Sequence, residues 1–101
     1  MEKDILEILF EQCKEIGKEN NIKGLLNPDI DTKLFHSNGY LDSLGLVAFI
    51  SGIEEKIADK FNIDILIVNE KAMSQYSSPF ISVKSLSDYI VTLIKAEHVN
   101  E

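Results

Sequence analysis

The sequence predicts an all-α fold of four helices, with a long first loop and a short third helix. Apolar residues recur at three- and four-residue steps in three stretches, a spacing that is typical of amphipathic helices. The stretch 63–68 is rich in β-branched residues but has no strand-like stretch to pair with, and a lone strand is unstable. The length of 101 residues suits one domain spanning residues 1–101.

The first predicted helix begins near Lys3 and frays between Gly17 and Asn20. Cys13 lies on its apolar face, so we expect a buried thiol. It is the only cysteine, which excludes an internal disulfide and a cysteine-based metal cluster. The expected inward positions are Ile5, Leu6, Leu9, Phe10, Cys13 and Ile16.

A long polar connection, 20–41, follows and contains two turn signals, Asn27-Pro28 and Asn38-Gly39. Connections of this length are often functional. The apolar residues expected to pin it to the core are Leu25, Leu26, Ile30, Leu34 and Phe35.

The second predicted helix begins near Asp42, whose carboxylate can accept from backbone N–H groups of the first turn, and runs to about Lys60. Its expected inward stripe is Leu46, Phe49, Ile50, Ile53, Ile57 and Phe61. The outer side of its first half is small or apolar, which suggests a docking surface beside the helix N-terminus. This apolar half-face consists of Leu44, Gly45, Val47, Ala48, Ser51 and Gly52.

The last third of the chain predicts two more helices. Residues 63–68 are expected to form an extended connector that buries its apolar side chains. Asn69 can cap a short third helix that runs through Gln75. Ser82 or Ser85 can cap a final helix that ends near Ala96. Its expected inward positions are Leu86, Tyr89, Ile90, Leu93 and Ile94.

Charge and composition limit the classes of partner that we expect the protein to bind. The formal net charge is -7 and the pI about 4.7, so the surface should repel nucleic acid and anionic membranes and attract basic protein patches. All ten basic residues are lysine, and arginine is the usual choice for bidentate phosphate and base-edge contacts. With no signal peptide or long apolar run recognisable, we expect a cytoplasmic protein, and a monomer.

Chemistry is most expected at Ser43, which would lie in the first turn of the second helix at the end of the long loop. Unpaired N–H groups and the positive helix end favour a phosphate attached there, and an accessible hydroxyl can be modified by another enzyme. Asp-Ser at a helix start is also a common capping pattern, so the dipeptide alone does not discriminate.

The order of motifs around Ser43 resembles the acyl carrier protein family over nearly the whole chain. Asp42-Ser43-Leu44 opens the second helix, and Ile53-Glu54-Glu55 follows two to three turns later. Phe61-Asn62-Ile63-Asp64-Ile65 comes after that helix, and Asp88-Tyr89-Ile90 lies near the end.

The resemblance implies a carrier and not an enzyme. Ser43 would receive 4'-phosphopantetheine from coenzyme A through a phosphopantetheinyl transferase, with Asp42 as the partner on the Mg²⁺ side of the transfer complex. The thiol of the arm would carry acyl groups as thioesters, loaded by an acyl-activating ligase or used by acyltransferase and synthase enzymes, as in fatty acid biosynthesis and lipid metabolism. Positions expected to contact partner enzymes are Leu44, Val47, Ser51, Glu54 and Glu55.

The chain departs from the family where acidic residues usually follow the motif, because Gly45 and Ala48 stand there. We therefore expect a specialised carrier with its own partners. The family also implies that an acyl chain would lie between the second and third helices, near Phe49, Ile53 and Met73, with Ile65 beside them.

Three alternatives remain open. An aminoacyl or peptidyl carrier would use the same arm. An unmodified acidic helical adaptor would use the apolar half-face and would not need the Ser43 hydroxyl. A small hydrolase would need a base at Ser43, for which the sequence offers only His36 on the loop.

Overall fold

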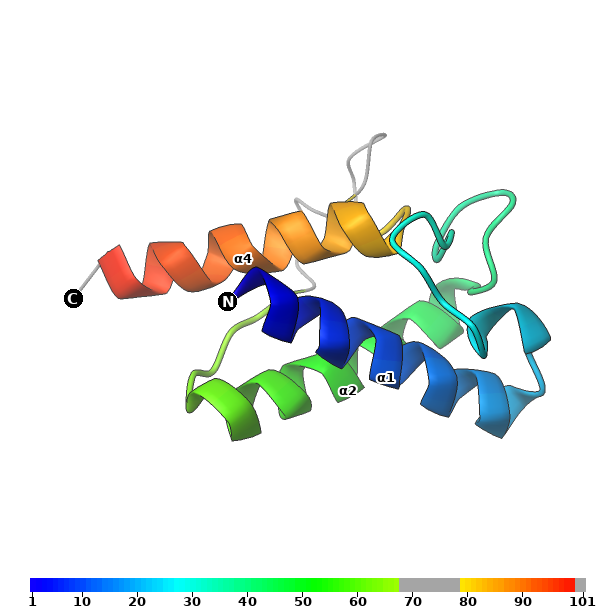
Figure 1. Ribbon diagram of the computed structural model, residues 1–101, viewed down its shortest axis with the longest axis horizontal. Helices are drawn as coiled ribbons and strands as arrows, with labels where there is room; N and C mark the ends of the chain where they lie inside the picture. Colours follow the sequence, from blue (N-terminus) through cyan, green and yellow to red (C-terminus); the bar gives the residue numbers. More distant parts are fainter. Residues whose placement is uncertain (68–78, 100–101) are drawn as a thin grey trace.

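The computed structural model describes residues 1–67 and 79–99, with the side chains of 97–99 excepted. Within these residues it contains three α-helices, α1 (Glu2–Asn20), α2 (Ser43–Phe61) and α4 (Val83–Val99), and one short 3₁₀ helix, η1 (Lys23–Leu25). The described residues form no strand, which confirms the all-α class (Figure 1). The predicted short third helix, Asn69–Gln75, lies outside them.

The ends of α1 and α2 and the beginning of α4 lie at signals that can be identified in the sequence. Asn21 and Asn62 follow α1 and α2 in the left-handed conformation, with φ angles of 57° and 55°, which asparagine tolerates better than most residues. Ser82 begins α4: its Oγ accepts from the Ser85 N–H at 3.2 Å, and the Ser85 Oγ accepts from the Ser82 N–H at 3.0 Å. The two serines therefore form a reciprocal cap, and the helix extends beyond the expected end at Ala96.

The core lies where α1 packs against both α2 and α4. Its fully buried side chains come from the predicted helix faces, from Val83 at the start of α4, and from four non-helical or 3₁₀ positions, Leu25, Leu34, Ile67 and Phe80. The inward stripe of α2 is confirmed except at Phe61, which is only half-buried, as are Leu6 and Phe10 of α1. Ile30 was expected to pin the loop but is 44% exposed, so that prediction is wrong.

The long loop between α1 and α2 is tied to the start of α4 by backbone hydrogen bonds. The Leu34 N–H donates to the carbonyl oxygen of Ile81 at 2.7 Å, and the Phe35 N–H donates to that of Phe80 at 3.0 Å. In the opposite direction, Val83 N–H donates to the carbonyl oxygen of Thr32 at 3.1 Å. This short ladder, together with burial of Leu34, anchors the loop that leads to Ser43.

The segment after α2 is an extended connector as far as Ile67. Ile63 and Ile65 are partly buried and Ile67 is fully buried, but Leu66 is 71% exposed. The expectation that all of its apolar side chains are buried is therefore wrong, because neighbouring side chains of an extended chain point in opposite directions. Glu54 of α2 fixes the connector by accepting a hydrogen bond from the Ile67 N–H at 2.7 Å.

Ion pairs join α1 to α2 on the outside of this packing. The Lys56 Nζ lies 3.0 Å from a carboxylate oxygen of Glu15 and 3.7 Å from one of Glu11. The Lys60 Nζ lies 3.4 Å from a carboxylate oxygen of Asp4. The hydrogen bond from Lys56 to Glu15 raises the pKa of the lysine. Among the described residues, no helix combines the length and the apolar run needed to cross a membrane.

Candidate functional site

The start of α2 is built by Asp42 as predicted. Its Oδ1 accepts a hydrogen bond from the Gly45 N–H at 2.7 Å, and its carbonyl oxygen accepts from the Leu46 N–H at 2.8 Å. Both bonds are typical of an N-cap residue. The backbone of Asp42 is extended, and the helix begins at the next residue. The cap fixes where the helix begins, and so it fixes Ser43 as the first helical residue.

Ser43 is exposed at this first position. Its N–H and that of Leu44 belong to the first turn and have no intrahelical acceptor, while the Gly45 N–H is already bound by Asp42. The helix dipole adds a partial positive charge at the same end. An ester phosphate on the Ser43 oxygen would therefore meet unpaired donors and a favourable potential.

Gly39 allows the loop to turn tightly just before this cap. Its N–H donates to the carbonyl oxygen of His36 at 2.8 Å, and the Leu41 N–H donates to that of Leu34 at 3.0 Å. A Cβ atom at Gly39 would overlap the Leu34 carbonyl oxygen. Glycine at this position therefore lets residues 39–41 pass close to Leu34. This close approach determines where Asp42 lies.

Most of the apolar half-face is exposed as expected. Leu44 is 83% and Val47 is 51% exposed, and Ala48 and Ser51 are exposed beside them. Gly52 does not belong with these residues, because the side-chain amide of Gln12 on α1 covers it. The exposed part of the apolar half-face therefore consists of Leu44, Val47, Ala48 and Ser51.

The two acidic residues further along α2 differ in their surroundings. Glu55 is exposed, whereas Glu54 is half-buried and holds the Ile67 N–H. Glu55 is thus the more available of the two for a basic partner.

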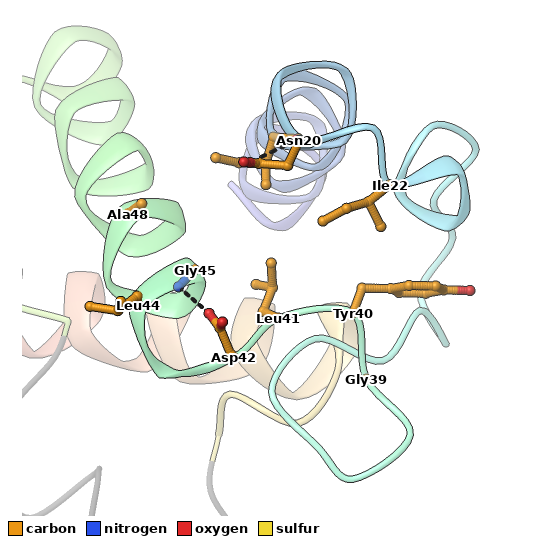
Figure 2. A pocket seen from close by; sticks show the side chains of 10 residues that line it. Asn20, Ile22, Gly39, Tyr40, Leu41, Asp42, Leu44, Gly45 and Ala48 are labelled. Atoms are coloured by element: carbon orange, nitrogen blue, oxygen red, sulfur yellow. Dashed lines mark hydrogen bonds between the residues drawn. The ribbon is translucent and has the colours of Figure 1, made fainter.

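A groove that the sequence did not predict lies beside Ser43. It encloses about 650 Å³, within the range of ligand pockets, and is formed by the end of α1, the loop and the first turns of α2. Figure 2 shows the Leu41 side chain pointing into the space between α1 and α2. The lining residues are Ile16, Asn20, Ile22, Gly39, Tyr40, Leu41, Asp42, Leu44, Gly45 and Ala48.

Cys13 and His36 are the other described residues with reactive side chains that the sequence analysis considered. Cys13 has no exposed surface, as predicted, and burial raises the pKa of its thiol to about 12. His36 is exposed in the loop, and its Nδ1 accepts a hydrogen bond from the Asn38 N–H at 3.2 Å. No cluster of three or more potential metal ligands occurs among the described residues.

Comparison with known proteins found no matching protein-family model, no matching curated protein and no matching solved structure.

The cap at Asp42 leads to a stability prediction. Asp42→Ala should lower the free energy of unfolding by about 1 kcal/mol, because the Gly45 N–H loses its acceptor. Asp42→Asn should lose much less, since an asparagine oxygen also caps well. Urea denaturation of the three proteins measures both differences, and equal stability of Asp42→Ala and wild type would contradict this role for the carboxylate.

Proposed function

We propose that this chain is an acyl carrier protein that bears a 4'-phosphopantetheine arm on Ser43. The observation that carries the proposal is an exposed serine hydroxyl at the first position of a capped helix, within the Asp42-Ser43-Leu44 motif. The proposal includes a four-helix fold with a short third helix, a monomeric state and a cytoplasmic location.

The attachment reaction needs coenzyme A and a phosphopantetheinyl transferase. The Ser43 oxygen attacks the phosphorus that bears the pantetheine group, and the bond from that phosphorus to the nucleotide breaks. Adenosine 3',5'-bisphosphate leaves, and a base of the transferase takes the serine proton. Asp42, next to the attacking serine, is the residue of this chain that we assign to the Mg²⁺ side of the transfer complex.

The carrier then works by tethering. A ligase or acyltransferase forms a thioester with the thiol of the arm, and partner enzymes receive the acyl group at high effective concentration. We assign partner contacts to Leu44, Val47 and Ser51, with basic partner patches drawn to Glu55 and, to a smaller extent, to Glu54. An aminoacyl group on the same arm would use the same geometry.

One observation favours a second candidate. Leu44 and Val47 are large apolar side chains exposed on adjacent turns, and an unmodified adaptor could use them to bind a protein partner. The adaptor makes no use of the Ser43 hydroxyl, so modification of that hydroxyl distinguishes the two functions.

Intact mass spectrometry tests the proposal. Incubation with coenzyme A, Mg²⁺ and a promiscuous transferase should add the mass of one phosphopantetheine group to wild type and none to Ser43→Ala. Ser37→Ala, which alters another exposed serine in the preceding loop, is the matched control and should be modified like wild type. An unmodified wild type would reject the carrier and leave the adaptor, and a mass gain retained in Ser43→Ala would reject the site.

A further inference from the structure

We propose that the groove beside Ser43 holds the pantetheine arm, so that the arm folds back between α1 and α2. This inference rests on the proposed function, because it needs the arm on Ser43. It differs from the family expectation of a chain between the second and third helices. Phe49 and Ile53, which were expected to line that other path, have no exposed surface, and Met73 lies outside the described residues.

The groove begins where the arm would be attached. Asp42 and Leu44, the chain neighbours of Ser43 on either side, both line it, and Gly45 continues the lining. The Leu44 side chain is 83% exposed, so its contact surface is open to an arm that starts one residue away. An arm attached to Ser43 therefore starts between two residues of the groove lining, Asp42 and Leu44 (Figure 2).

The chemistry of the lining matches that of the arm. Beyond its phosphate the arm is uncharged, and it carries a dimethyl group, a hydroxyl, two secondary amides and a thiol. The lining offers apolar surface from Ile16, Leu41 and Ala48, and Asp42, at the mouth, is its only residue charged at neutral pH. Asn20 donates its side-chain N–H to the Ile16 carbonyl oxygen at 3.2 Å, which leaves its own amide oxygen available to accept from the arm.

A buried acceptor lies beyond the inner end of the groove. Gln12 precedes Ile16 by one turn of α1, and Gly52 follows Ala48 by one turn of α2, and the two meet. Gln12 is only 5% exposed, and its Oε1 has no hydrogen-bond partner among the described residues. Buried acceptors are normally satisfied, but Gln12 does not line the groove, so the arm reaches this oxygen only if the contact between Gln12 and Gly52 opens.

The thiol of the arm reports on docking without interference. Cys13 has no exposed surface, and burial raises the pKa of its thiol to about 12, so reagents in solution do not reach a reactive thiolate there. In the modified protein, the arm's thiol is therefore the one that alkylating reagents reach. Iodoacetamide should react with an undocked arm at the rate found for free pantetheine.

The experiment compares wild type, Ala48→Phe and Ala96→Phe, each carrying the arm. Ala48→Phe fills the groove, whereas Ala96→Phe adds the same bulk to an exposed position of α4 outside it. Wild type and Ala96→Phe should be alkylated about fivefold more slowly than free pantetheine, as for an arm docked about four-fifths of the time. Ala48→Phe should react like free pantetheine, and its urea midpoint before modification should match that of wild type.

Methyl NMR of wild type with and without the arm gives a second readout. We expect the largest shifts at Ile16 and Leu41. If mass spectrometry shows the arm on Ser43 while alkylation is as fast as for free pantetheine and these methyl signals stay unchanged, the groove proposal is wrong and the carrier stands. Shifts confined to Ile53 and Ile65 would overturn it in favour of the other path, and a chain that takes no arm would overturn both proposals.

Discussion

Replacing Gly52 with leucine should destabilise the native state by about 3 kcal/mol, because it forces a side chain into an occupied space. The Gln12 amide from α1 already lies where a Cβ atom of residue 52 would be. Gln12 is 5% exposed, so its amide, although it ends a flexible side chain, has to give up its present packing to make room. Leucine is a better helix former than glycine, so intrinsic propensity opposes this loss and cannot be its cause.

A double-mutant cycle separates the clash from other effects. Gln12→Ala removes an amide whose Oε1 is unpartnered among the described residues, so we expect it to change stability by less than about 1 kcal/mol. In the Gln12→Ala background, the free energy of unfolding lost through Gly52→Leu should be at most half as large, since one side chain then replaces another of similar volume. Urea denaturation of the four proteins gives the coupling energy between positions 12 and 52, which is expected to be about 1.5–3 kcal/mol.

Ser51→Leu is the matched control for this cycle. It adds the same side chain to the neighbouring, exposed position of α2 and should change stability by no more than about 0.5 kcal/mol. Additive effects of Gln12→Ala and Gly52→Leu would show that the amide is not what limits the size of residue 52.

Gly39→Ala should lower the free energy of unfolding by about 2–3 kcal/mol, for a different steric reason. Here the obstacle is the Leu34 carbonyl oxygen, a backbone atom that already accepts the Leu41 N–H. It cannot rotate away as the end of a side chain could, so the loop must move and the hydrogen bond from Leu41 must lengthen. Urea denaturation gives the loss, and faster hydrogen exchange at the Leu41 amide should accompany it.

Ser37→Ala is the control for this loop, because Ser37 lies in the same turn and is exposed. It should leave both the unfolding free energy and the exchange rate of Leu41 close to those of wild type. Wild-type exchange at Leu41 in Gly39→Ala would show that the loop accepts a side chain at position 39.

The helices could be predicted because their signals are local. Apolar periodicity predicts α1, α2 and α4. A cap needs only its own first turn, so the sequence also indicates Asp42 as one cap and either Ser82 or Ser85 as the other. The same local reasoning placed Ser43 at an exposed helix start, the core of the candidate site. Bounds shifted by one to three residues, which is where side-chain patterns fade.

What the sequence did not reveal depends on contacts between distant segments. The ladder between the loop and the start of α4 is made of backbone groups, which leave no side-chain pattern. The sequence predicts a buried Leu66 because apolar residues occur on both sides of the connector. Its exposure depends on which of these residues pack against the core. The groove joins Ile16, Leu41 and Ala48 from three segments, and no local signal marks such a meeting.

The hydrogen-bond ladder between the loop and the start of α4 also has a consequence for folding during synthesis. Leu34 and Phe35 find their partners at Phe80 and Ile81, which leave the ribosome long after the loop itself has been made. These long-range pairings form late, because closing so large a loop is entropically costly. A chain that ends before Phe80 would lack the partners of Leu34 and Phe35, so the segment that leads to Ser43 would be untethered.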